Sequence, residues 1–252
     1  MNKKKVGVLA AAGLMTVGVV GGTLAWFTSW DSVTNVFYTG KNGVEIYEYF
    51  NSPSVVVPGD VTPKLVQIKN TANYDSFIRV KFNRTWADLD GNVDTSLSTE
   101  NIILNFTDNV VEYKDGRYSY VNGKEDAVES VHGKWIKSGD YYYYVGRVPG
   151  TPEDDKTPDI SFTNTLLESV TLLNTSDNDY RDKKFNVEVI AESIQADNNA
   201  YESLNIQDPI ITDLLATYSD KDKPSLDAGY EQAKDVTTTG EPGSIRDYVK
   251  AE

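Results

Sequence analysis

Acidic side chains provide the spacing in this chain that comes closest to a ligand set. In "DLDGNVD", Asp88, Asp90, Asn92 and Asp94 place oxygen atoms at alternate positions, as calcium-binding loops do. Glycine stands at the fourth position of this segment instead of the sixth, and no acidic residue stands at the twelfth. The segment therefore favours a turn over a calcium loop, with weak calcium binding left open.

Histidine and cysteine chemistry is almost absent. His132 is the only histidine, and we interpret it as a solvated loop residue because a catalytic or metal-bound histidine needs partners that the sequence does not offer. The chain has no cysteine and no HExxH, GxGxxG or GxxxxGK[ST] motif. Paired carboxylates for glycoside hydrolysis stay open, since nothing places any two of the acids together. The sequence predicts no catalytic residue, no metal site, no cofactor and no enzyme.

The N-terminus has the layout of a secretory signal. Three lysines precede the uncharged residues 6–20, and two glycines then lead to Thr23 and Ala25. Thr23 and Ala25 are small and occupy the −3 and −1 positions of a cut between Ala25 and Trp26. An uncleaved anchor is the alternative, because the uncharged run could span a bilayer as one helix of about 20 residues. We predict a helical leader and a signal peptide over residues 1–25.

The rest of the chain is strongly acidic. The protein has 24 Lys and Arg against 38 Asp and Glu, and removal of residues 1–25 takes three lysines and no acid, so the net charge moves from −14 to −17 (21 − 38). Such a chain lacks the general basic field that binds nucleic acid or an anionic membrane. Without cysteine, its stability depends on burial and strand pairing, not on disulfides.

Apolar and polar residues alternate along most of the chain, in segments rich in Val, Ile, Tyr and Phe, as in half-buried strands. The dipeptide Asp115-Gly116 between two alternating arms predicts a hairpin over residues 110–121 with a type I′ turn. We predict an all-β fold, an antiparallel jelly-roll-like sandwich over residues 39–197. The other alternating segments are 43–50, 64–70, 76–82, 101–106, 134–148 and 183–196.

The alternation ends at residue 198. Residues 198–252 are rich in Asp, Pro, Thr and Gly, and helix-like pieces occur only near Ile210 to Tyr218 and Ser225 to Lys234. We predict an acidic C-terminal appendage that is partly helical and partly disordered. It carries no apolar span and no sorting motif.

Residues 26–38, directly after the expected cut, read as an apolar strand. Residues of one parity include Trp26 and Trp30, and residues of the other include Phe27 and Val33. Left free, this segment would be an exposed apolar patch and an unpaired edge. It is therefore expected either to fold back as the first strand of its own domain or to be donated to another subunit.

The segment "TLAWFTSWDSVTNVFYTG" resembles the start of the TasA/camelysin family, exported biofilm matrix proteins processed by a SipW-type signal peptidase. The family pattern is matched by Ala25, Trp26, Phe27, Thr28, Asn35 and Phe37. The resemblance continues in family order through 55–82, 134–150, 165–173 and 185–198, so it extends from Leu24 to about Asn198. Within the family the chain looks closest to the BsaA-type clostridial biofilm proteins.

The resemblance implies a jelly-roll subunit that polymerises into fibres outside a Gram-positive bacterium. A donated N-terminal strand would complete the sheet of the next subunit, gaining main-chain hydrogen bonds and burying alternate side chains. The implied partners are other copies of the chain, the signal peptidase and minor matrix or anchoring proteins, with no nucleic acid. The implied polymerisation strand contains Trp26, Phe27, Thr28, Trp30, Val33, Asn35 and Phe37.

Two other classes of function stay open. A surface metalloprotease of camelysin type is disfavoured, because a zinc site made almost wholly of carboxylates is poor zinc chemistry. A carbohydrate-binding module would depend on the aromatic run "DYYYYVGR". Tyr141 and Tyr143 would face one way and Tyr142 and Tyr144 the other, so we expect one pair to lie in the core.

Overall fold

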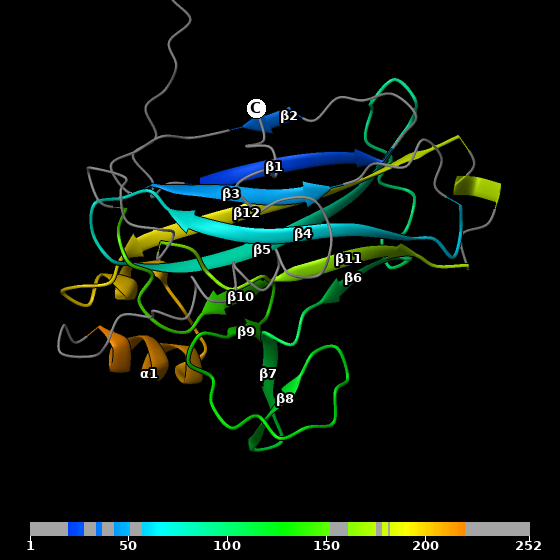
Figure 1. Ribbon diagram of the computed structural model, residues 1–252. Helices are drawn as coiled ribbons and strands as arrows, with labels where there is room; N and C mark the ends of the chain where they lie inside the picture. The colour runs from blue at the N-terminus through cyan, green and yellow to red at the C-terminus, as the bar shows by residue number, and fades with distance from the viewer. Residues whose placement is uncertain are drawn as a thin grey trace, which may run out of the picture.

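The computed structural model describes residues 20–27, 34–36, 43–50, 57–151, 161–174, 178–180 and 182–219. Two β-sheets pack face to face, and one short helix lies beside the larger sheet (Figure 1). The strands are β1 (Val20–Phe27), β2 (Thr34–Val36), β3 (Val44–Phe50), β4 (Val61–Asn70), β5 (Ser76–Ala87), β6 (Ile102–Phe106), β7 (Val110–Lys114), β8 (Arg117–Tyr120), β9 (Trp135–Ser138), β10 (Tyr141–Tyr144), β11 (Leu167–Leu172) and β12 (Lys184–Gln195). The helices are the 3₁₀ turns η1 (Asn178–Tyr180) and η2 (Ala200–Leu204) and the α-helix α1 (Pro209–Tyr218).

The larger sheet has eight strands in the order β2-β1-β12-β5-β10-β9-β7-β8, and the smaller sheet has the order β3-β4-β11-β6. The mostly-β, two-sheet architecture predicted from the alternation is confirmed. The longest pairing joins β12 to β5 over twelve residues, antiparallel, from Lys184 opposite Ala87 to Gln195 opposite Ser76. These two strands form the centre of the larger sheet, with β1 beside β12 and β10 beside β5.

The predicted hairpin is present as β7 and β8. Asp115 and Gly116 form its turn with φ angles of 52° and 80°, the left-handed values that a type I′ turn requires. The expectation of purely antiparallel pairing is wrong at one place, because β7 pairs with β9 in parallel. Residues 121–134 form a long connection after β8, which returns the chain to the far side of β7 and lets β9 run in the same direction.

The helical leader expected from the sequence is also wrong for its last residues. Residues 20–25 belong to β1, which pairs with β12 in an antiparallel register. Gly21 and Gly22 favour this outcome, because glycine destabilises a helix interior and the rim of the sheet offers main-chain partners instead. The first residues of the expected 26–38 strand, Trp26 and Phe27, complete the same strand.

The main core lies between the two sheets. Its members come from inward-facing positions of both sheets, and the largest fully buried ones include Trp135 and Tyr144. On β12 the inward positions are Val187, Val189 and Ala191, all 0% exposed. Burial on this scale, at about 25 cal/mol per Å² of apolar surface, explains how the chain folds without disulfides.

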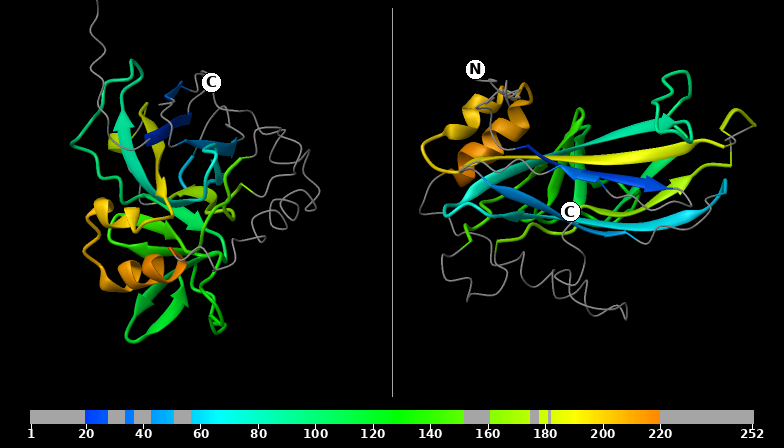
Figure 2. Two further views of the ribbon diagram at one scale, coloured as in Figure 1. Left: turned by 90° about the vertical axis from the view of Figure 1, so that its left-hand side faces the viewer. Right: turned by 90° about the horizontal axis from the view of Figure 1, so that it is seen from above.

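A second, smaller core lies on the outer face of the larger sheet, under α1 and η2 (Figures 1 and 2). Ile211 and Leu215 of α1 are buried there against Phe77, Ile136 and Tyr143 of the sheet. The helix begins at Pro209, and the Asp208 side chain caps it by accepting from the Ile210 amide.

The helix predicted near Ile210 to Tyr218 is therefore present, packed on the sheet. The second expected piece, Ser225 to Lys234, lies outside the described residues. In the part of the chain that the structure describes, no helix has the length and apolar character needed to cross a bilayer.

Candidate functional site

The N-terminal strand lies at the rim of the larger sheet, between β12 and β2. Trp26 is opposite Asn186, and Phe27 is opposite Phe185. In β2, Asn35 is opposite Thr23 of β1. Figure 2 shows β1 running along β12 at one side of the molecule, where β1 also contacts β3 of the smaller sheet. At this rim, β1 therefore contacts strands of both sheets.

Part of the expected polymerisation strand falls within these elements. Trp26 and Phe27 lie in β1 and Asn35 lies in β2, whereas Thr28, Trp30, Val33 and Phe37 lie outside the described residues. The expected signal cleavage site, Ala25 and Trp26, lies near the end of β1. The structure therefore brings the expected cut and the first donor residues onto one strand beside β12.

Polar side chains cover the outer face of β12. Arg79 of β5 donates from Nε to Glu192 Oε2 at 2.6 Å, and Asn83 donates from Nδ2 to Glu188 Oε2 at 3.1 Å. Burial is the largest single effect and would lower the pKa of Arg79, but the hydrogen bond and charge of Glu192, with smaller effects of Tyr143 and Tyr141, together raise that pKa. Asn186 is buried, and its Oδ1 has no hydrogen-bond partner among the described residues. Both acids of this face are thus already neutralised or hydrogen-bonded by their own sheet.

A second open edge lies on the other side of the molecule. β6 ends the smaller sheet, and β5 pairs with β10 only through residues 79–81, so residues 82–86 of β5 have a strand on one side alone. A groove of about 920 Å³ runs between these two edges. Arg84 bridges it by donating from Nη1 to the Ile102 carbonyl at 2.7 Å.

The groove has an aromatic floor and charged walls. Phe82, Phe106 and Tyr142 form the floor, with the Phe82 and Tyr142 rings 5.6 Å apart and nearly perpendicular. Burial raises the pKa of Tyr142, so its hydroxyl stays protonated at every physiological pH. The walls carry three basic and two acidic side chains, namely Lys81, Arg84, Lys137, Asp140 and Glu168. This groove could hold an extended chain or a polar ligand of mixed charge.

The four consecutive tyrosines of β10 do not form an exposed platform. Tyr142 and Tyr144 face the main core, and Tyr143 is buried in the second core under α1. Tyr141 is half-buried, with the Arg79 guanidinium 4.2 Å above its ring. The expectation that one pair lies in the core is confirmed, and α1 covers much of the other face as well.

The acidic loop of residues 88–94 is a turn. Asp88 accepts hydrogen bonds from the amide and the side-chain amide of Asn92, both at 2.9 Å. Asp94 accepts from Lys183 Nζ at 2.6 Å, and this bond, with those from Ser96, lowers its pKa to about 2. Within the described residues, no group of three or more His, Asp or Glu side chains is arranged to hold a metal ion.

His132 is less solvated than the sequence suggested. It lies in the connection before β9, but it is half-buried, and its ring stacks on Tyr218 of α1. Burial lowers its pKa, and its Nε2 has no partner among the described residues. The expectation of a solvated loop residue is wrong because α1 packs over this connection.

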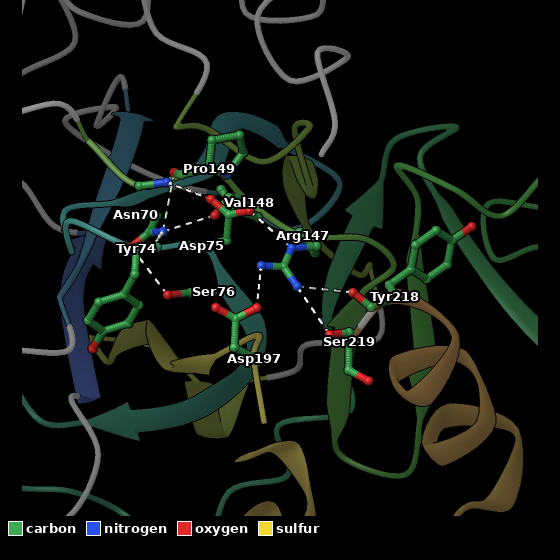
Figure 3. Close-up of polar contacts among 11 residues, drawn as sticks. Asn70, Tyr74, Asp75, Ser76, Arg147, Val148, Pro149, Asp197, Tyr218 and Ser219 are labelled. Atoms are coloured by element: carbon green, nitrogen blue, oxygen red, sulfur yellow. Dashed lines mark hydrogen bonds and ion pairs between the residues drawn. The ribbon is translucent and has the colours of Figure 1, made fainter. Parts of the chain in front are cut away.

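A buried arginine joins the end of α1 to the ends of β5 and β12 in the larger sheet, as Figure 3 shows. Arg147 donates from Nε to Asp75 at 3.0 Å and from Nη2 to Asp197 at 2.7 Å. Its Nη1 donates to the carbonyls of Tyr218 and Ser219 at the end of α1. Burial would lower the pKa of Arg147, yet the two carboxylates outweigh it and raise that pKa. With Arg147 only 5% exposed, this cluster fastens the helix and offers no surface to a substrate.

The same region contains a buried asparagine that holds two loops together. Asn70 donates from Nδ2 to the carbonyls of Tyr74 and Val148 at 2.8 and 2.9 Å (Figure 3). Its Oδ1 accepts from the Ala72 amide. Gly150 fits beside this node because a Cβ there would lie 2.5 Å from the Tyr74 amide nitrogen. Sequence reasoning missed Arg147 because Asp75 and Asp197 lie 72 and 50 residues away, and it missed Asn70 because its partner Val148 in the second loop lies 78 residues away.

Comparison with models of known protein families, with curated proteins and with solved structures gives no match for this chain.

Proposed function

We propose that this protein is a secreted structural subunit of extracellular biofilm fibres, not an enzyme, with a jelly-roll-like fold. The observation that carries the proposal is the place of the residues around the expected cut. Val20–Phe27 pairs as a strand with β12 at the rim of the larger sheet, and this pairing supports a rim that accepts a strand from the N-terminal region. A strand of another subunit in the same place would complete the sheet in the same way.

In this proposal a SipW-type signal peptidase releases residues 1–25, and the mature N-terminal strand of each subunit adds to the next. The partners are other copies of the chain and minor matrix or anchoring proteins, at the surface of a Gram-positive bacterium. Assembly brings many acidic subunits together, so it should proceed faster as salt screens their repulsion.

The first test compares the protein beginning at Trp26 with the uncut chain by electron microscopy. Fibres are expected from the first protein and not from the second. Mass spectrometry of the protein released from cells should show the loss of residues 1–25. An intact leader on the extracellular form would contradict the proposed processing.

The second test removes or changes the donor strand. Deletion of residues 26–37 should leave a folded domain that cannot elongate, because the acceptor is kept and the donor is lost. Phe27→Asp and Val33→Asp place a carboxylate on one parity of the strand, and Trp26→Asp and Trp30→Asp place it on the other. On the buried parity the change should lower polymer affinity by orders of magnitude, because an unpaired charge enters an apolar pocket.

On the parity that faces solvent, the same change should be tolerated. Thr28 and Ser32 have the same parity as Trp26, so Thr28→Asp and Ser32→Asp test whether that parity faces solvent. Fibres that form normally without residues 26–37 would refute strand donation. The groove between β5 and β6 would then be the place to test for a bound glycan.

A further inference from the structure

The expected cut between Ala25 and Trp26 falls inside β1. Six of the eight residues of β1, 20–25, lie before the cut and pair with residues 187–192 of β12. Only Trp26 and Phe27 would remain beside β12 afterwards. The main-chain groups of β12 that face β1 would then lose most of their partners.

The strand β2 depends on the same leader residues. Its three register pairs join residues 34–36 to residues 22–24 of β1, and β2 pairs with no other strand that the structure describes. Removal of residues 20–25 therefore takes away every strand partner of β2. One cut would open most of the rim of β12 and release residues 34–36 from β1, so that among the described residues only Trp26 and Phe27 would still pair the segment 26–37 with the sheet.

The length of the segment 26–37 matches the length of the whole strand β12. β12 has twelve residues and is paired over all twelve by β5 on its other side. The segment 26–37 also has twelve residues. A strand of that length extends roughly 40 Å at about 3.3 Å per residue.

The chain's own segment cannot fill the whole rim. Figure 1 shows β1 and β3 pointing the same way, so a strand in the place of β1 must be followed by a return to the start of β3 at Val44. If all of 26–37 lay on β12, the strand would extend roughly 40 Å along it, and the chain would have to return over most of that length to reach β3. Only residues 38–43 would be left for the return, and they reach at most about 21 Å. A second copy of the chain has no such tether.

The chemistry of the rim also suits this occupant. The inner face of β12 presents Val187, Val189 and Ala191 to the core, and the acids of its outer face, Glu188 and Glu192, are bonded by their own sheet. The segment 26–37 has one charged residue, Asp31, and no base. Its addition therefore leaves no acid of β12 newly unpaired.

The edge of β6 is a poorer acceptor. It has only five residues, and its Ile102 carbonyl already accepts the bond from Arg84.

We propose that residues 20–25 of the uncut chain occupy the acceptor edge of β12, and that cleavage vacates this edge for the segment 26–37 of a second copy. This inference rests on the proposed function. It identifies β12 as the strand that accepts the donor, and cleavage of the leader as the step that controls assembly. The leader acts as a temporary strand in its own molecule. Cleavage removes that strand at the moment when it frees the donor.

Disulfide trapping tests the first half, since the chain has no cysteine of its own. Gly22 and Ile190 are opposite each other in the register. In the uncut chain carrying both Gly22→Cys and Ile190→Cys, an intramolecular disulfide should form on oxidation, because opposite residues have the spacing that a disulfide needs. The pair Gly22→Cys and Leu104→Cys, which directs the second cysteine to β6, should stay reduced. Absence of the first disulfide would overturn occupancy of the edge by the leader.

The second half is tested on proteins beginning at Trp26. One population carries Ile190→Cys, and the other carries a single cysteine at each position from 28 to 36 in turn. Mixed fibres should yield covalent dimers at donor positions of one parity near a single register. Leu104→Cys replaces Ile190→Cys in the control and should give none.

The possible results distinguish failure of this inference from failure of the proposed function. Fibres whose cross-links go to the Leu104→Cys protein would overturn the β12 acceptor and leave strand donation standing. Fibres with no cross-link to either protein at any donor position would also overturn it. A disulfide formed only within a chain carrying both cysteines, without dimers, would show that the segment returns to its own β12. Unsubstituted protein that forms no fibres would refute the proposed function itself.

Discussion

The imidazole of His132 lies flat on the phenol ring of Tyr218, with ring centroids 4.7 Å apart and planes 3° from parallel. The stack joins the connection before β9 to the last turn of α1. Since His132 is the only histidine of the chain, any effect of its titration on stability can be assigned to one residue.

Stability should decrease as the pH falls below about 6.5, the ordinary pKa of histidine. Burial lowers the pKa of His132 in the folded protein, so the unfolded state takes up the proton first, and the free energy of unfolding falls until the pH passes the folded value. Urea unfolding between pH 7.5 and 5.5 measures this slope. His132→Phe keeps a ring on Tyr218 and should flatten the slope, whereas an unchanged slope would place its origin elsewhere.

Replacement of Arg147 should loosen the attachment of α1. Arg147→Met leaves Asp75 and Asp197 without the guanidinium and the last carbonyls of the helix without a donor, so we expect a loss of about 3 kcal/mol in urea unfolding. Lys124→Met is the matched control, because Lys124 pairs with Asp108 at the surface and should matter little. Equal losses in the two variants would contradict a special role for the buried arginine.

A buried ion pair inside the smaller sheet predicts strong coupling between two residues. Lys64 Nζ lies 2.8 Å from Glu48 Oε1, and the two side chains are 0% and 5% exposed. Lys64→Met alone should cost about 3–5 kcal/mol, because Glu48 would lose the ammonium group that lies beside it in the core. The double variant with Glu48→Leu should recover most of that loss in a double-mutant cycle. Additive losses would mean that the residues are not coupled.

Removal of metal should leave the fold unchanged. The carboxylates of Asp88 and Asp94 are taken by Asn92 and Lys183, so the loop has no need of an ion to hold its shape. Melting curves with and without EDTA should overlay. A large shift in the melting temperature that disappears in Asp88→Asn with Asp90→Asn would reveal a calcium site instead.

The strands were predictable because alternation is a local signal. The segment predicted at 183–196 became β12, and Asp115-Gly116 identified the turn of the β7–β8 hairpin. The run Tyr141–Tyr144 could be divided by parity, but its sequence could not say that α1 would bury most of its outer face. A tyrosine is compatible with both a solvent-exposed and a buried position, so only the tertiary contact with α1 determines whether this face is buried.

The candidate site was only partly predictable. The apolar segment after Ala25 identified a strand in need of a partner, but β12 as that partner is more than 150 residues away and carries no sequence mark of it. The Arg147 cluster was invisible for the same reason, since Asp75 and Asp197 are 72 and 50 residues from it in the chain.

The central place of β12 also has a consequence for the order of folding. β12 lies between β1 and β5 in the sheet, yet it is the last strand along the part of the chain that the structure describes. During synthesis, β5 lacks its longest-paired neighbour until residues 184–195 have emerged, so the larger sheet forms late and through contacts distant in sequence, which are slow to form. In the export that we propose, the chain would cross the membrane with this sheet still open, and the pairing of β12 with β5 would be completed only on the far side.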